Sequence, residues 1–168
     1  LENRKGIILQ AHMDMVPQKN NDTNFDFAKD PIEAYIDGEW VTAKGTTLGA
    51  DNGIGVAAAM AILADKSVVH PPLEVLVTVD EETGMYGAFA LEGGLLQGKT
   101  LLNLDSEAEG ELYVGCAGGV DTTAKFAYTP VPVEEGDVAI KVSVTGCKGG
   151  HSGCDIHLQR ANANKLLF

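Results

Sequence analysis

The feature that most constrains the fold is the placement of three short apolar runs along the chain. They occupy residues 6–11, 73–79 and 100–104, and each has the length and the apolar or β-branched content of a buried strand. Between them, residues 55–64 and 88–96 carry apolar side chains at spacings that suit a helix. Strands that alternate with helices predict an α/β fold, in which flanking helices cover a mostly parallel sheet.

The character of the sequence changes after a glycine-rich stretch at 115–119. Strand-like segments at 122–128 and 138–145 follow, and residues 156–168 have helical spacing. We therefore place a domain boundary near Gly118, with the α/β domain in residues 1–118 and the first part of an α+β domain in residues 119–168. The chain opens in a strand-like run and stops in a helix-like one, so we expect both ends to be cut from a longer protein.

Composition and charge argue against several classes of partner. The chain has a net charge of −12, and such a surface repels nucleic-acid phosphates and attracts cations. No apolar run reaches the roughly 20 residues that a membrane helix needs, and no signal-like segment opens the sequence. The 3 cysteines are an odd number and lack the spacing of a disulfide framework, which favours a reduced, cytoplasmic protein. We expect neither nucleic acid nor a membrane as a partner.

Polar side chains gather where the three predicted strands end. His12 and Asp14 follow the first run, Asp-Glu-Glu at 80–82 follows the second, and Asp105 follows the third. Ligands of open parallel sheets bind at the carboxyl ends of the strands, so we expect these side chains at one rim. Asp51 adds another carboxylate from a glycine-flanked turn. The charges would repel unless a cation lay among them, and the mixture of His, Asp and Glu suits zinc or a similar divalent metal, with two ions sharing one carboxylate.

Each of these signals also has a purely structural interpretation. Asp51 could be only the N-cap of its helix, and His12 with Asp14 could be only a satisfied polar pair. Adjacent glutamates such as Glu81 and Glu82 usually lie in solvated loops, and an acidic residue after a strand is often a turn residue. The coincidence of all these residues at one rim favours a metal site.

A glycine-rich loop at 146–153 carries another histidine, His151. Cys147, His151 and Cys154 have a spacing that resembles a thiolate–imidazole zinc site. That site lacks a fourth nearby ligand, since His157 would point elsewhere on the helix. We instead expect the loop to present His151 as a polarising donor, with a helix-capping loop residue as the alternative.

Four segments resemble the motifs of the co-catalytic zinc exopeptidases, a family that includes carboxypeptidase G, succinyl-diaminopimelate desuccinylase and the carnosinases. In chain order they are AHMDMVP (11–17), TLGADNG (47–53), DEETG (80–84) and GGHSG (149–153). The resemblance runs over nearly the whole chain. Within this family, GADNGIG (49–55), LDSE (104–107) and YVGCAGG (113–119) are most similar to the bacterial aminoacyl-histidine dipeptidases.

The resemblance implies two zinc ions held by the residues of the rim. His12 and Asp105 would bind one ion, Glu82 would bind the other, and Asp51 would bridge both. Cobalt or manganese could occupy the same ligands. The family completes its second zinc site with a histidine from a C-terminal segment, which no residue after His157 can supply, so we expect the protein to continue beyond this chain.

The resemblance also implies roles for the neighbours of these ligands. Asp14 would hold the His12 imidazole, and Glu81 would be the general base that takes a proton from the bridging water. The peptide bond between Asp51 and Asn52 would be cis. His151, in a lid and dimerisation domain, would reach the substrate carbonyl or the developing oxyanion.

The implied activity is hydrolysis of dipeptides, preferably Xaa-His dipeptides such as carnosine, by an intact protein that is a homodimer. This chain alone is expected to lack part of the site. Two other hypotheses stay open: hydrolysis of acylated amino acids by the same fold, and a non-catalytic metal-binding or dimerisation module. Glu81 beside Glu82 separates enzyme from module, because a structural ion needs no unligated carboxylate next to a ligated one.

Overall fold

The computed structural model describes residues 3–151 and 155–168 of the chain. Two compact units make up the chain, Leu1–Leu112 and Tyr113–Phe168. The domain boundary that we place near Gly118 stays a prediction. Within the described ranges, no helix combines the length and the apolar character needed to cross a membrane.

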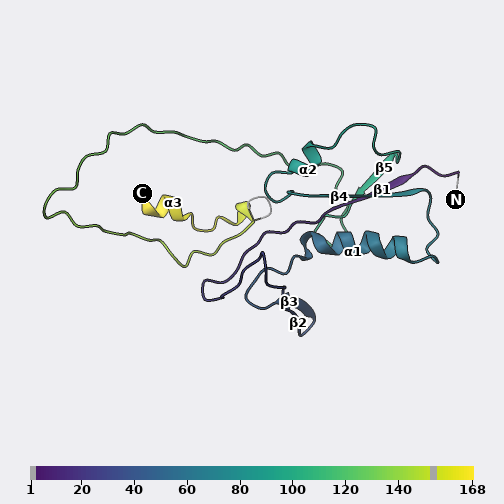
Figure 1. Cartoon of the computed structure of the whole chain (residues 1–168), viewed down its shortest axis with the longest axis horizontal. Helices are drawn as coiled ribbons and strands as arrows, with labels where there is room; N and C mark the ends of the chain where they lie inside the picture. The colour runs from purple at the N-terminus through teal and green to yellow at the C-terminus, as the bar shows by residue number, and fades with distance from the viewer. Residues whose placement is uncertain (1–2, 152–154) are drawn as a thin grey trace. The chain divides into compact units, whose positions relative to one another are not determined.

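The first unit is built on a three-stranded parallel sheet with the strand order β4-β1-β5 (Figure 1). The central strand is β1 (Ile7–His12), flanked by β4 (Leu73–Thr78) and β5 (Thr100–Asn103). Apolar side chains of β1 are buried, as the predicted buried strand requires. The predicted parallel sheet is therefore confirmed, and all three strands end at the same edge.

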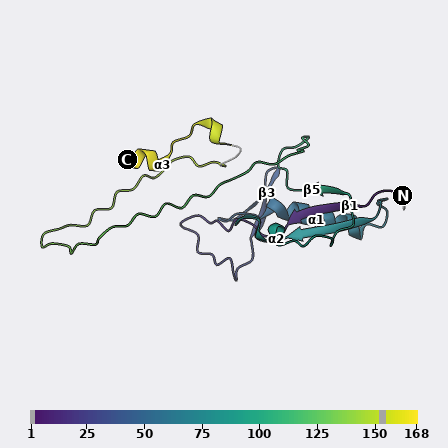
Figure 2. The ribbon, with the colours of Figure 1, turned by 90° about the horizontal axis from the view of Figure 1, so that it is seen from above.

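The long helix α1 (Ala50–Ala64) packs against β1, and Figure 2 shows the two running alongside each other. Asp51 and Asn52 have non-helical backbone angles, so regular helical geometry begins after them. Gly55 and Ala59 are buried one turn apart on this helix. Small residues at this spacing allow the helix to lie close to the sheet.

The second predicted helix differs from the prediction in position and length. We expected helix over 88–96, whereas α2 is one turn at Tyr86–Phe89. The prediction counted the apolar residues and underestimated the glycine pair that follows, in which Gly94 has a φ of +89°. The helix already ends at Phe89, before this pair. Glycine costs about 1 kcal/mol in a helix relative to alanine, and the positive φ of Gly94 is incompatible with helix through residue 96.

A β-hairpin between β1 and α1 was not predicted. It pairs β2 (Ala34–Asp37) with β3 (Trp40–Ala43) in antiparallel register, with Asp37 opposite Trp40. The two-residue turn contains Gly38 at a φ of +62°, the left-handed conformation that tight hairpin turns require.

The described part of the second unit contains little regular structure: the 3₁₀ turn η1 (Ile156–Leu158) and the short helix α3 (Ala163–Leu167). The continuous helix predicted over 156–168 is wrong, because Gln159 has a left-handed φ of +50° and interrupts it.

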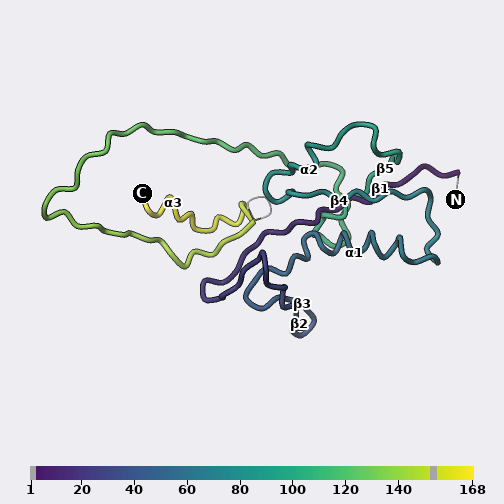
Figure 3. The backbone as a smooth tube through the Cα atoms, viewed as in Figure 1, coloured from purple at the N-terminus to yellow at the C-terminus, as the bar shows by residue number. Residues whose placement is uncertain are grey.

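The strands predicted at 122–128 and 138–145 are also wrong, although the structure describes both segments in full. They form two separate arms of one open loop (Figure 1, Figure 3). Phe126 is 84% exposed and Val142 is 70% exposed, so neither arm buries its apolar side chains. Alternating side chains favour extended backbone, but a strand forms only when its N–H and C=O groups find a partner strand.

Candidate metal centre

His12, the last residue of β1, is the centre of the site and is only 1% exposed. Its Nδ1 donates to the backbone carbonyl oxygen of Asp14 at 2.9 Å. A carbonyl oxygen can only accept, so the proton is on Nδ1 and the other ring nitrogen faces the site. Nε2 lies 3.0 Å from Oδ1 of Asp51 and 3.3 Å from Oδ1 of Asp105. This orientation is typical of a histidine prepared to bind a cation.

Asp51 is free to face His12 because its neighbour caps the helix. Oδ1 of Asn52 accepts the backbone N–H of Gly55 at 3.1 Å, the contact that an N-cap side chain makes, at the point where the regular part of α1 begins. The structure therefore contradicts the interpretation of Asp51 as only the helix cap. The peptide bond between Asp51 and Asn52 is cis, and that prediction is confirmed.

Asp14 joins the loop after β1 to the loop after β4. Its carboxylate accepts the backbone N–H of Glu81 at 3.2 Å and that of Glu82 at 3.1 Å. Burial alone would raise the pKa of Asp14, but these two donors outweigh it and hold the pKa below its ordinary value. Asp14 therefore stays ionised while it anchors both glutamates.

Among the residues that the structure describes, one group of ligand atoms lies close enough for a metal ion. Atoms of His12, Asp51 and Glu82 all lie within 4.8 Å of one another. One imidazole nitrogen and two carboxylates are a donor set that fits a zinc-type divalent ion. Oε2 of Glu81 lies 4.0 Å from Nε2 of His12, so this carboxylate adjoins the group without belonging to it.

The charges of the site perturb one another. Burial raises the pKa of Glu82, and the charges of Asp51 and Glu81 raise it further. Burial likewise raises the pKa of Asp105, with the same two carboxylates adding to the effect and His12 opposing it. For His12, burial lowers the pKa, but Asp105 and the other acidic neighbours more than offset this and raise it overall. Negative charge is in excess here, which a bound cation would relieve.

Asp105 is held from two sides by amide side chains. Nδ2 of Asn52 donates to Oδ1 of Asp105 at 2.6 Å, and the backbone N–H of Asp105 donates to Oδ1 of Asn103 at 3.0 Å. Sequence reasoning missed both partners. The contact to Asn52 joins residues 53 positions apart, and no local pattern in the sequence signals it.

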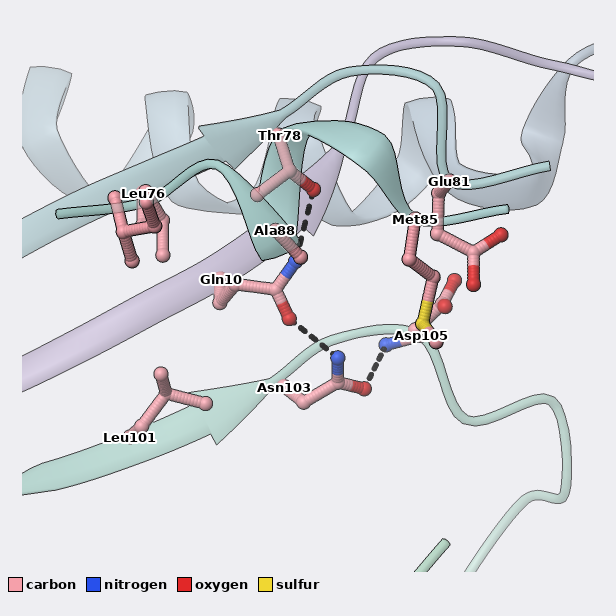
Figure 4. A pocket seen from close by; sticks show the side chains of 10 residues that line it. Gln10, Leu76, Thr78, Glu81, Met85, Ala88, Leu101, Asn103 and Asp105 are labelled. Carbon is pink, nitrogen blue, oxygen red and sulfur yellow. Dashed lines mark hydrogen bonds between the residues drawn. The ribbon is translucent and has the colours of Figure 1, made fainter. Parts of the chain in front are cut away.

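A pocket of about 270 Å³ lies beside the site (Figure 4). Polar side chains link the three strands on this face of the sheet. Asn103 donates to Oε1 of Gln10, whose own amide donates to Oγ1 of Thr78 at 3.4 Å. Glu81 and Asp105 also line the pocket, so the linked amides extend to the acidic rim.

The structure brings most of the predicted site residues together at the carboxyl edge of the sheet: His12, Asp14, Asp51, Glu81, Glu82 and Asp105. His151 belongs to the second unit, where its backbone N–H donates to Oδ2 of Asp155 at 3.1 Å. Its reach toward a substrate stays a prediction. Cys154, part of the alternative thiolate site, lies outside the described residues.

Comparison with known proteins identifies relatives over nearly the whole chain. The cytosol non-specific dipeptidase of Escherichia coli (strain K12) is 62% identical over 167 residues, which cover 99% of this chain and 34% of that protein. The uncharacterized protein YqjE of Bacillus subtilis (strain 168) is 30% identical over 146 residues, which cover 82% of this chain and 37% of that protein. The chain thus spans about a third of the length of these curated relatives.

Two solved structures also match this chain over about a third or less of their own length. The crystal structure of aminoacylhistidine dipeptidase from Vibrio alginolyticus matches with a TM-score of 0.70 and 57% identity, over 99% of this chain and 34% of that one. Aminopeptidase PepT from Bacillus cereus matches with a TM-score of 0.52 and 29% identity, over 64% of this chain and 27% of that one. The profile of peptidase family M20/M25/M40 matches residues 8–161. Because that match covers most of the chain, the chain belongs to peptidase family M20/M25/M40.

Proposed function

We propose that the intact protein is a metal-dependent dipeptidase and that this chain supplies most of its metal centre. The observation that carries the proposal is the group formed by His12, Asp51 and Glu82, with the carboxylate of Glu81 beside it. Membership of a peptidase family and the names of the 62% and 57% identical relatives support the same reaction.

The proposed cofactor is a pair of zinc ions. His12 and Asp105 would hold one ion, Glu82 would hold the other, and Asp51 would be a ligand of both. The 3.0 and 3.3 Å distances from Nε2 of His12 to the two aspartates support a shared ion for these three residues, and the excess of negative charge supports bound cations. When bound, such ions supply a water that ionises near neutral pH and polarise the scissile carbonyl.

Glu81 is the proposed general base. It takes a proton from the attacking water and passes it to the amine that leaves. Its carboxylate lies at the edge of the ligand group, 4.0 Å from Nε2 of His12, and is therefore near the reaction without being committed to a metal. Asp14 positions both partners, because it contacts the His12 ring and accepts the N–H of Glu81.

The proposed substrates are dipeptides, with Xaa-His dipeptides such as carnosine among them. The names of the two relatives differ in breadth, one non-specific and one aminoacylhistidine, and both are consistent with this range. We further propose a cytoplasmic homodimer in which His151 donates to the developing oxyanion. A donor in that position contributes about 3–4 kcal/mol to the transition state.

Replacement of Glu81 tests the catalytic part of the proposal. E81Q in the intact protein should lower kcat for a dipeptide by about 10²–10⁴-fold, the usual contribution of general acid–base catalysis. The zinc content, measured by mass spectrometry of the metal, should stay at the wild-type value. E39Q, at an exposed glutamate of the β2–β3 turn, is the matched control and should leave both quantities unchanged. Undiminished turnover by E81Q would show that another group is the base.

A further inference from the structure

We propose that Asn52 is a positioning residue whose side-chain amide fixes the carboxylate of Asp105 for metal binding. The proposal rests on the proposed metal centre, in which Asp105 is a ligand. Its structural basis is the 2.6 Å hydrogen bond from Nδ2 of Asn52 to Oδ1 of Asp105.

Both ends of the Asn52 amide are committed, and the side chain is only 1% exposed. Oδ1 accepts the N–H of Gly55, which can only donate, and Nδ2 donates to the Asp105 carboxylate, which in its ionised form can only accept. The amide fits these partners in one orientation. Asn52 therefore connects the start of α1 to Asp105, the second residue after the end of β5.

The space around this amide depends on Gly55. A Cβ atom at position 55 would collide with Oδ1 of Asn52 and would lie 3.0 Å from the carbonyl oxygen of Leu104. Gly55 lies in the regular part of α1, so steric space rather than backbone conformation requires glycine here. The absence of a side chain lets the helix bring Asn52 within reach of Asp105.

An amide is suited to this task because it donates without carrying charge. The Asp105 carboxylate has a competing contact, since its Oδ1 lies 3.3 Å from Nε2 of His12. A lysine or arginine could also orient the carboxylate, but its positive charge would repel the metal ions. The neutral donor thus holds Oδ1, the oxygen of Asp105 that lies next to His12, without adding positive charge to the site. Partners of this kind usually change metal affinity by about 10–100-fold.

The test measures zinc affinity of the intact protein by competition with a chromogenic chelator. N52S removes the amide N–H₂ that reaches Asp105 but keeps a good helix cap, whereas N52A removes both. We expect both variants to lose roughly 10-fold or more in affinity for the ion that depends on Asp105. Only N52A should lower the unfolding temperature of the metal-free protein. N162S is the matched control: Asn162 caps α3 by accepting the N–H of Lys165 at 3.1 Å, and its replacement should leave zinc affinity unchanged.

A double-mutant cycle with D105A shows whether Asn52 acts through Asp105. The combined variant N52S/D105A should bind zinc as D105A does. Wild-type affinity in N52S, or an equal loss with and without Asp105, would overturn the positioning role while the metal centre stands. An unchanged zinc affinity in D105A itself would instead overturn the assignment of Asp105 as a ligand, and this proposal with it.

Discussion

His12 can bind a cation only through Nε2, because its Nδ1 proton is committed to the carbonyl oxygen of Asp14. That commitment follows from the backbone path at the end of β1, where residue 14 turns back toward the ring. The carboxylate of Asp14 then lies 3.5 Å from the same nitrogen and also accepts two N–H groups from the next loop. One aspartate thus orders two loops of the site.

The role of Asp14 predicts a specific pH dependence. Its folded-state pKa lies below the ordinary value of 3.8, so its ionised form stabilises the fold above that pH. The contribution is lost as the pH falls through the lowered pKa. D14N should therefore reduce the free energy of unfolding of the metal-free protein near pH 7, and the difference from wild type should shrink below pH 3.8. Urea titrations at several pH values measure this, and a difference that is constant with pH would contradict it.

The raised pKa values of Glu82, Asp105 and His12 predict competition between protons and metal. Ligands bind metal in their deprotonated forms, so zinc affinity should fall as the pH drops from about 8 to about 5. In the metal-free protein, by contrast, protonation of His12 stabilises the fold. This stabilisation is present at low pH and is lost as the pH rises through the raised pKa of His12. Calorimetry in buffers of different ionisation enthalpy should detect proton release on zinc binding. Binding without proton release would contradict this account.

Sequence reasoning reached the residues of the rim because each lies at or just after the end of an apolar, strand-like run. His12, Glu82 and Asp105 were predictable in this way, and Asp51 was suggested by its glycine-flanked turn. Asn52 and Asn103 were not, because their hydrogen bonds to Asp105 depend on how the loops fold in three dimensions. The partners that orient the ligands could be identified only from the structure.

At the scale of elements, the close approach of α1 to the end of β5 predicts an unusual glycine effect. Alanine normally stabilises a helix relative to glycine by about 1 kcal/mol. G55A should instead destabilise the metal-free protein by about 1–3 kcal/mol, because the added methyl group would overpack against Asn52 and Leu104.

The neighbouring Gly53 provides the matched control for this prediction. A Cβ atom there would meet nothing within 4 Å, so G53A should leave stability unchanged or slightly raised. Chemical denaturation of both variants measures the difference. Equal stability of G55A and G53A would show that α1 has room for a side chain against β5.

The parallel strands were predictable because a short apolar run rich in Val, Ile and Leu is visible in the local sequence alone. The strands predicted at 122–128 and 138–145 were wrong because alternation of apolar and polar side chains says nothing about where a partner strand lies. The helix expected over 88–96 failed at its glycines, and the β2–β3 hairpin was missed although Gly38 marks its turn. Patterns of local sequence thus identified the strands of the parallel sheet better than the elements around them.

At the scale of the whole molecule, the chain spans 34% of the length of its 62% identical relative. The centre described here has one histidine among its grouped ligand atoms, together with Asp51 and Glu82. We therefore expect the intact protein to contribute a further ligand to the second ion, and this chain alone to hold at most one ion tightly.

Metal content measured together with hydrolysis of Xaa-His dipeptides, on the intact protein and on this chain, tests the central claim most directly. We predict two zinc ions per intact subunit, cleavage that a chelator abolishes and zinc restores, and a chain that binds at most one ion tightly and does not cleave. An intact protein that binds no metal, or that cleaves no dipeptide when it is loaded with zinc, would contradict the account and leave the acidic rim with a structural role.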